Sequence, residues 1–257
     1  MLLQSILLHY FIASLLFTLF VSAMRGSHFT TVAGKTILPK LGALNSQFNI
    51  ILASGSPRRR ELVGLMGLQH FQVLVSDFAE DLDKKAFANP VDYCLLTAQK
   101  KVESVIANQL ASAPPNTIVI GADTIVVIDG IVLEKPADDQ NAKMMMMMLS
   151  GHTHLVHTAV TLYTNALSPG RIQHHASFIE TTDVTFADLK EEDMIAYIAS
   201  GEGRDKAGGY GIQGLGGQLV QRICGCYFNV MGLPIHALSS KLADLVHEAE
   251  DQADKEL

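Results

Sequence analysis

The chain has 257 residues, of which 48% are hydrophobic and 18% are charged; this composition is typical of a globular protein and excludes a disordered one. Its formal net charge of −7 at pH 7 argues against a general nucleic-acid-binding protein, which would present a basic face. The three cysteines, Cys94, Cys224 and Cys226, have no framework spacing, so we expect reduced thiols and a reducing compartment.

Leu, Ile, Phe and Val dominate the first 24 residues, and no Asp, Glu, Lys or Arg occurs between Leu2 and Ala23. Such a stretch is long enough to cross a bilayer, whereas a signal peptide would start with basic residues that are missing here. Three interpretations stay open: a membrane anchor, a cleaved signal, and a non-native extension before a true start at Met24 or later. We favour the last, with residues 25–47 as a linker of low structural content and residues 48–250 as one cytoplasmic domain.

The first half of this domain alternates apolar strand patterns with helical spacing. We expect strands at 49–53 and 71–75, a helix from Pro57 to about Met66, a charged loop at 77–85 and a helix over 90–110. A β-branched strand at 117–120 should stop at Gly121, and segments 125–128 and 131–133 should form a hairpin around Asp129-Gly130.

The second half begins with a helix over 137–150 that contains five consecutive methionines, Met144 to Met148. We interpret them as packing residues with some exposed surplus rather than as a copper site. There follow antiparallel strands at 153–165 and 172–186, a helix over 189–199, a glycine-rich loop over 201–217, strands to about Met231 that include Cys224 and Cys226, and a last helix over 234–248. This order implies an α/β fold with a mixed sheet flanked by helices.

One segment, Ser54-Gly55-Ser56-Pro57-Arg58-Arg59-Arg60-Glu61, lies where the first strand gives way to a helix. Backbone amides and hydroxyl groups there can face an anion, and guanidinium groups match phosphate in a bidentate way. Arginines at a helix start are unfavourable for the helix dipole, so we expect an anionic partner. The alternative is a solvated basic turn.

Two later segments offer further groups that suit a polyphosphate. In Gly121-Ala122-Asp123-Thr124, the carboxylate of Asp123 could accept a proton from water or hold Mg²⁺, although a lone Asp after a strand is more often a cap. Lys135 could fold back to the same sheet edge, or it could be a surface lysine. Lys206 precedes a run of glycines that suits a phosphate or base pocket, although the spacing matches neither a P-loop nor a dinucleotide fingerprint.

The histidines of the strand at 153–165 are a competing hypothesis for a functional site. The alternation of a strand puts His152 and His154 on one face and His157 on the other. Because no acidic residue lies near them in sequence, we interpret them as strand-surface histidines, and His174-His175 in the same way.

Six segments in order resemble the Maf family of nucleoside triphosphate pyrophosphatases, over about Asn49 to Ala243. They are Leu52-Ala53-Ser54-Gly55-Ser56-Pro57-Arg58-Arg59, Gly121-Ala122-Asp123-Thr124, Glu134-Lys135-Pro136, Ser150-Gly151, Asp205-Lys206-Ala207-Gly208-Gly209-Tyr210-Gly211-Ile212-Gln213-Gly214 and Asn229-Val230-Met231-Gly232-Leu233-Pro234. The resemblance implies an elongated mixed sheet with a substrate cleft, as in Maf, Ham1 and inosine triphosphatase proteins. It also implies hydrolysis of a nucleoside triphosphate between the α- and β-phosphates. The departures from the family are Gly203, where proline is frequent, and Cys226, where a polar residue is common.

The same resemblance assigns expected roles to individual residues. Asp123 is the general base and, with Glu80, holds a divalent cation, Mg²⁺ or Mn²⁺. Phosphate is bound by Ser54, Ser56, Arg59, Lys101, Lys135 and Lys206. Substrate selection falls on Arg58, Thr124 and Gln213, a combination similar to the branch that takes dTTP, UTP and modified uridine nucleotides. The family also favours a homodimer, with no nucleic acid as partner and a membrane only if residues 1–24 are an anchor.

Two rival functions remain at this point. A nucleotide-binding regulator of cell division would bind without hydrolysis, but the presence of Asp123, Lys135 and Lys206 favours chemistry. A membrane-tethered or secreted nucleotide hydrolase depends entirely on residues 1–24.

Overall fold

The computed structural model of the chain describes residues 39–255, so the interpretations of residues 1–24 and of most of the predicted linker lie outside the described residues. The strands are β1 (Asn49–Ala53), β2 (Phe71–Val73), β3 (Thr117–Ile128), β4 (Ile131–Leu133), β5 (Thr153–Thr164), β6 (Gln173–Phe186) and β7 (Val220–Cys224). The helices are α2 (Pro39–Gln47), α3 (Pro57–Leu65), α4 (Pro90–Gln109), α5 (Asp139–Leu149), α6 (Glu191–Ser200), α7 (Tyr227–Met231) and α8 (Ile235–Lys255). None of the helices between residues 39 and 255 is both long and apolar enough to cross a membrane.

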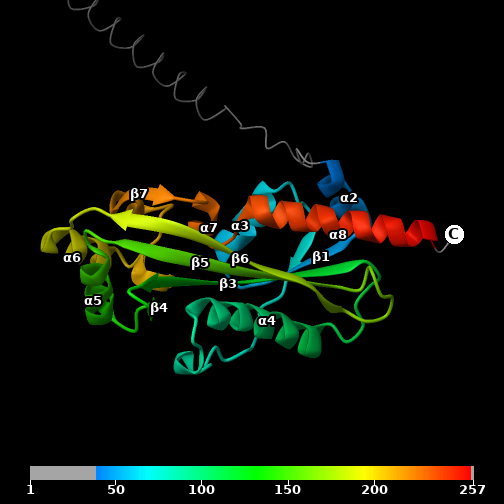
Figure 1. Cartoon of the computed structure of the whole chain (residues 1–257), viewed down its shortest axis with the longest axis horizontal. Coiled ribbons are helices and arrows are strands. Elements are labelled where there is room, and N and C mark those ends of the chain that lie inside the picture. The colour runs from blue at the N-terminus through cyan, green and yellow to red at the C-terminus, as the bar shows by residue number, and fades with distance from the viewer. Residues whose placement is uncertain (1–38, 256–257) are drawn as a thin grey trace, which may run out of the picture. The chain divides into compact units, whose positions relative to one another are not determined.

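The strands form a seven-stranded sheet in the order β2-β1-β3-β5-β6-β7, with β4 paired to the far end of β3. β1 runs parallel to β2 and β3, while the pairs β3–β5, β5–β6 and β6–β7 are antiparallel. The long strands β3, β5 and β6 extend the sheet well beyond the short parallel part (Figure 1). This arrangement confirms the mixed sheet flanked by helices that the sequence predicts.

Both faces of the parallel part of the sheet are covered, because consecutive residues of its strands are apolar. Ile50 and Leu52 of β1 pack in a core that includes residues of α2, α3 and α8. Ile51 and Ala53 face the other way, into a core with α4. Figure 1 shows α4 on one side of the sheet and α8 with α2 on the other. The parallel part of the sheet is therefore buried on both faces, as parallel strands usually are.

The far end of the sheet is packed by α5 and α6. Met145 and Met146 of α5 are buried in a core with Val156 of β5, whereas Met144 and Met147 are exposed. The methionine run therefore packs as predicted, with a surplus on the outer face of the helix. The predicted hairpin is confirmed by β3 and β4, and Asp129 and Gly130 at its tip have φ of 50° and 77°, the positive values that a type I′ turn requires.

Strand β3 continues through Gly121 to Ile128, so the prediction that it stops at Gly121 is wrong. A Cβ at Gly121 would lie 2.1 Å from Cγ2 of Val102 and 3.2 Å from the carbonyl oxygen of Ala98, both on α4. The glycine therefore allows helix and strand to approach closely and does not make a turn. As a consequence, Asp123 lies within a strand rather than after one.

Two further predictions fail locally. The end of the predicted linker is the helix α2, because Leu41 and Leu44 are buried in the core shared with α8. The strands expected up to Met231 give way to α7 after Cys224, and Cys226 precedes this helix as its N-cap residue. α7 ends at Gly232, whose φ of 112° is easily adopted only by glycine.

The histidines of β5 also differ from the prediction, because this central strand is covered on both faces. His154 is 1% exposed and His157 is 7% exposed, so neither is a surface residue. Nε2 of His154 makes a 2.8 Å hydrogen bond with the hydroxyl of Tyr210, and Nδ1 of His157 makes a 2.9 Å bond with the hydroxyl of Thr181. His152 and His174 are exposed, as expected.

Candidate active site

The site begins at a gap in the sheet edge. β1 pairs with β3 as far as Ala53 and Gly121, and β4 pairs with β3 only from Val126 onward. Between these points, residues 122–125 of β3 have no strand partner on that side within the described chain. Asp123 and Thr124 lie in this gap, and their side chains leave the strand on opposite faces. Ala53 is followed there by Ser54, which starts the loop into α3.

Arg59 closes much of this gap. Its guanidinium donates hydrogen bonds to the carbonyl oxygens of Ala122 and Gly232, both at 2.9 Å. It also donates to the hydroxyl oxygens of Ser54, at 3.2 Å, and Thr124, at 2.9 Å. Four of its five N–H groups are thus used within the protein. Burial lowers the pKa of Arg59, and the Asp123 carboxylate opposes that shift. Arg59 therefore joins the loop after β1, strand β3 and the residue that follows α7.

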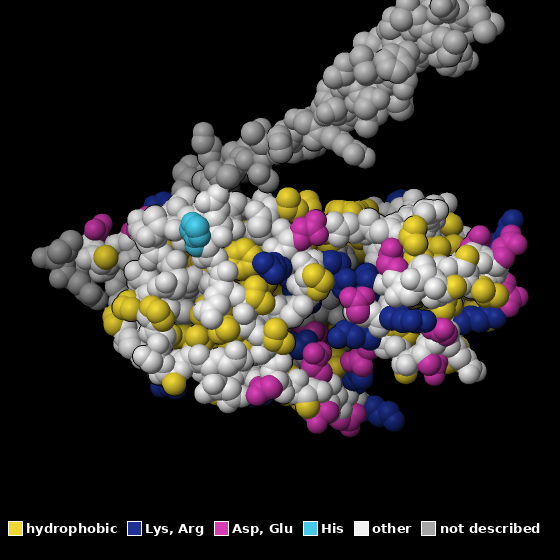
Figure 2. Space-filling model, turned by 180° about the vertical axis from the view of Figure 1, so that it is seen from behind, with side chains coloured by type: hydrophobic (Ala, Val, Ile, Leu, Met, Phe, Trp, Pro, Cys, Tyr) yellow, Lys and Arg dark blue, Asp and Glu magenta, His cyan; other side chains and the backbone are white. Residues whose placement is uncertain are grey.

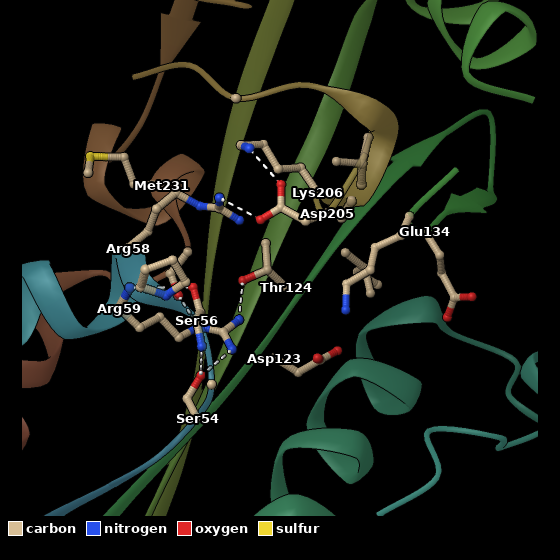
Figure 3. A pocket seen from close by; sticks show the side chains of 18 of the residues that line it. Ser54, Ser56, Arg58, Arg59, Asp123, Thr124, Glu134, Asp205, Lys206 and Met231 are labelled. Carbon is tan, nitrogen blue, oxygen red and sulfur yellow. Dashed lines mark hydrogen bonds and ion pairs between the residues drawn. The ribbon is translucent and has the colours of Figure 1, made fainter. Parts of the chain in front are cut away.

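A single cavity of about 1070 Å³ opens at this gap. All of the site residues expected from the sequence line it: Ser54, Ser56, Arg58, Arg59, Glu80, Lys101, Asp123, Thr124, Lys135, Lys206 and Gln213. Figure 2 shows Lys, Arg, Asp and Glu side chains gathered around a hollow near the middle of one face. In Figure 3, residues from α3, β3 and the glycine-rich loop lie around this cavity. Segments that are far apart in sequence are thus brought together.

On one wall, a lysine lies between two carboxylates. Nζ of Lys101, on α4, is 2.8 Å from Oδ1 of Asp123 and 2.8 Å from Oε2 of Glu80. Glu80 has a φ of 53°, which is uncommon for a residue other than glycine and is found disproportionately at functional sites. The Asp123 side chain is nearly buried, while that of Glu80 is 45% exposed. Asp123 is therefore held in a fixed position at the cavity wall.

On another wall, a carboxylate lies between two cations. Oδ2 of Asp205 is 3.3 Å from Nη1 of Arg58, and Oδ1 is 2.6 Å from Nζ of Lys206 (Figure 3). Burial by itself would raise the pKa of Asp205, but Lys206 and Arg58 outweigh it and hold the pKa below its ordinary value. Asp205 therefore holds Arg58 and Lys206 close together, and these two positive charges could bind an anionic ligand.

The hydroxyl of Thr124 belongs to a hydrogen-bond chain whose direction is fixed. Thr158 donates its only hydroxyl proton to the carbonyl oxygen of Asn229, at 3.1 Å. The 3.0 Å bond between the two threonine hydroxyls must therefore carry the proton of Thr124. Since Arg59 already donates to Thr124, this hydroxyl has no proton left for the cavity and can only accept there.

Glu134, Tyr93 and Asp205 also line the cavity, although no role was expected for them from the sequence. The Tyr93 hydroxyl donates to Oε1 of Glu134 at 2.6 Å, and Lys84 lies 2.8 Å from Oε2 of the same glutamate. Glu134 and Asp205 belong to segments noted in the sequence, but Tyr93 lies in an ordinary helical pattern that gives no signal. Lys135 is exposed and forms no ion pair with any of residues 39–255.

A divalent cation in this site would need ligands from both the protein and a bound substrate. In the part of the chain that the structure describes, no group of three or more His, Cys, Asp or Glu side chains could hold a metal. Asp123 and Glu80 nevertheless converge on one positive charge, the Lys101 ammonium. Mg²⁺ is commonly held by one or two carboxylates together with substrate phosphates. The donor set therefore fits a cation that arrives with a phosphorylated ligand.

The arrangement combines an ordered carboxylate with cations on several sides of one cavity. Such a site can bind a chain of phosphates through charge-assisted hydrogen bonds. It can also place a carboxylate beside a water molecule that attacks phosphorus.

Comparison with known proteins points to the same chemistry. The family model described as "Maf-like protein" matches residues 49–245. A Bacillus cereus protein named dTTP/UTP pyrophosphatase is 44% identical over 193 residues, which are 75% of this chain and 93% of that protein. A Shigella boydii protein of the same name is 44% identical over 187 residues, or 73% of this chain and 88% of that protein.

A human relative is a longer protein. The chain is 43% identical to a probable bifunctional dTTP/UTP pyrophosphatase/methyltransferase protein over 216 residues, which are 82% of this chain. The match spans about a third, 34%, of the length of the human protein.

Proposed function

This chain belongs to the Maf family, and on that premise we propose that it hydrolyses dTTP, UTP and modified uridine nucleotides between the α- and β-phosphates. The products are a nucleoside monophosphate and pyrophosphate. The observation that carries this proposal is the meeting of Asp123, Arg58, Lys101, Lys135 and Lys206 around one cavity, although they come from separate segments of the chain.

The reaction needs a base and a set of positive charges. Asp123 accepts a proton from water as the water oxygen bonds to phosphorus and the bond from phosphorus to the αβ-bridging oxygen breaks. Arg58, Lys135 and Lys206 stabilise the negative charge on the transferred and leaving groups. Ser54, Ser56 and the remaining N–H of Arg59 contribute hydrogen bonds to the phosphates. Lys101 orients the Asp123 carboxylate through their ion pair, at 2.8 Å.

Glu80 and Asp123 would hold the divalent cation, Mg²⁺ or Mn²⁺, together with phosphate oxygens. When bound, the cation neutralises charge on the phosphate chain. Lys101, which contacts both carboxylates, would then share them with the cation.

The hydrogen-bond chain through Thr124 supports a preference for uracil and thymine. Toward the cavity, Thr124 can accept a hydrogen bond but cannot donate one, because its proton goes to Thr158. N3 of uracil or thymine carries a proton, whereas N3 of cytosine is an acceptor. A cytosine placed there would leave two acceptors facing each other, and such a mismatch is costly in a buried site. Arg58 and Gln213 complete the proposed selection.

The proposal is tested by incubating the purified full chain with dTTP, UTP, CTP, ATP and GTP, each with Mg²⁺ or Mn²⁺, and measuring pyrophosphate. We expect pyrophosphate and monophosphate from dTTP and UTP at a higher kcat/KM than from the others. Release of inorganic phosphate instead, or no product from any nucleotide, would contradict the proposal. The second outcome, with binding retained, would favour the non-catalytic regulator.

A substitution isolates the role of Asp123. Asp123→Asn should lower kcat by about 100-fold or more, because the base is lost while the shape of the site is kept. UTP binding, measured by calorimetry, should change little. Asp129→Asn is the matched control, since it makes the same chemical change in the turn at the end of β3 and should leave kcat unaltered. Unchanged turnover in Asp123→Asn would remove this residue from the role.

The homodimer and the cytoplasmic location expected from the sequence stay predictions.

A further inference from the structure

The glycine-rich loop that carries Lys206 and Gln213 is held together by Glu202, a residue with no role in the reaction proposed above. Oε2 of Glu202 accepts a hydrogen bond from the backbone N–H of Leu215 at 2.8 Å. Oε1 accepts from the backbone N–H of Gly216 at 3.0 Å. The carboxylate thus joins two points of the chain that are 13 and 14 residues away from it.

The same residue also contacts the start of the loop, and Tyr197 connects it to the middle of the loop. The backbone carbonyl of Glu202 accepts a hydrogen bond from Nζ of Lys206. The hydroxyl of Tyr197 donates to Oε1 of Glu202 at 3.3 Å and accepts from the backbone N–H of Gly211 at 3.1 Å. One glutamate and one tyrosine therefore fix the loop at its start, middle and end.

The loop backbone lies directly against this carboxylate. A Cβ at Gly214 would be 2.3 Å from Oε2 of Glu202, closer than any real contact allows. Gly214 follows Gln213, the residue expected to select the nucleobase of the substrate. The backbone next to Gln213 is therefore held against Glu202, while the Gln213 side chain also donates a hydrogen bond to Oε1 of Glu61 at 3.1 Å.

Glu202 remains an acceptor at neutral pH. Burial by itself would raise its pKa, but the hydrogen bonds from Gly216, Leu215 and Tyr197, with the charge of Lys206, outweigh burial and lower the pKa. Burial raises the pKa of Tyr197, so its hydroxyl keeps the proton that it donates. Asp205 lies at the same loop, where it pairs with Lys206.

We propose that Glu202 is a positioning residue, which connects the two ends of the loop through its hydrogen bonds. These bonds hold Lys206 near the phosphates and Gln213 near the nucleobase of the substrate. The inference rests on the proposed function, since it specifies how two of the substrate-binding residues are kept in place. Glu202 lies within the family match, but none of the roles expected from the sequence falls on it.

The test is Glu202→Gln in the full chain. The amide keeps the size of the side chain, but it offers one acceptor oxygen and turns an N–H₂ donor toward a backbone N–H. We expect KM for UTP to rise at least about tenfold, and kcat/KM for UTP relative to CTP to fall, because Lys206 and Gln213 are both displaced. Affinity for inorganic pyrophosphate, measured by calorimetry, should fall with it. Glu192→Gln, at an exposed glutamate of α6, is the control and should change none of these values.

A merely structural role would lower the folded fraction, and so kcat and the melting temperature, without changing KM or the ratio of UTP to CTP. That result, or unchanged kinetics, would overturn the inference. If Glu202→Gln does not fold, Tyr197→Phe removes only the hydroxyl between Glu202 and Gly211. It should raise KM by about threefold, and an unchanged KM would likewise overturn the inference. An unmodified chain that hydrolyses no nucleotide would instead contradict the proposed function, while pyrophosphate binding would still test Glu202.

Discussion

Arg58 and Arg59 are neighbours in sequence but have different surroundings in the site. Arg58 makes one ion pair, with an Asp205 side chain that is 60% exposed. Arg59 instead donates to two carbonyl oxygens and two hydroxyl oxygens inside the gap of the sheet. A guanidinium can serve several acceptors in one plane, which a lysine ammonium on a flexible stem cannot do in the same geometry. Arg59 thus supports the fold as well as the ligand site.

This difference gives a prediction at the scale of residues. Arg59→Lys should lower the free energy of unfolding by about 2–4 kcal/mol, because buried acceptors in the gap lose charged donors. Arg58→Lys, the matched control, should leave the free energy of unfolding within about 0.5 kcal/mol, since an exposed ion pair contributes little. Urea denaturation of both variants measures the two effects. Equal stability of the two variants would show that Arg59 has no structural role.

Among the elements, the contact of β3 with α4 places Asp123, the proposed general base. α4 carries Lys101, the partner of Asp123, and β3 carries Asp123 two residues after Gly121. Helix and strand come close enough for this ion pair because Gly121 presents no side chain to Val102. The distance between the two elements therefore controls the position of the carboxylate.

The element-scale prediction is a double-mutant cycle at this contact. Gly121→Ala should lower the free energy of unfolding by about 1–3 kcal/mol, because its Cβ would overlap Val102 and force α4 away. Val102→Ala in the same chain should recover part of that loss, although each substitution alone is destabilising. Strictly additive effects in chemical denaturation would mean that the glycine is not there to make room for Val102.

At the scale of the whole molecule, a buried histidine links stability to pH. His154 lies in the core at the far end of the sheet, where its ring contacts Phe186 and Tyr210 edge to face. Burial lowers the pKa of His154 from 6.5 to about 4. Burial also lowers the pKa of His157 on the same strand. In the folded state these rings stay neutral at pH values where the unfolded chain would bind protons.

Stability should therefore fall as pH decreases below 6.5, the pKa of an unburied histidine, and the contribution of His154 should be fully lost near pH 4. For this shift the loss amounts to roughly 3 kcal/mol. The free energy of unfolding measured from pH 7 to pH 4 should decline less steeply in His154→Gln, which cannot take up the proton. Because carboxylates titrate in both proteins, the difference between the two profiles isolates His154. Parallel profiles would contradict the prediction.

Most elements could be predicted from local pattern. Pro57 at the start of α3 and Asp129-Gly130 at the hairpin tip act within a few residues, so the sequence near them is enough. The resemblance to the Maf family likewise indicated many of the cavity-lining residues, although not Tyr93. Prediction failed where a residue's neighbour is distant in sequence: Gly121 meets α4, Leu41 and Leu44 of α2 meet the core beneath α8, and His154 meets Tyr210.

The sequence by itself therefore determined the fold class, the family and the chemical groups available for phosphate chemistry, because these follow from residue types and short-range spacing. Only the tertiary structure decided what each group contacts. It places Arg59 in the gap of the sheet and directs the hydroxyl proton of Thr124 toward the hydroxyl oxygen of Thr158. It also brings the loop that carries Lys206 into hydrogen bonds with Glu202. The physical reason is that buried polar groups must find partners, and those partners come from whichever segments the packed sheet and helices bring within hydrogen-bonding distance.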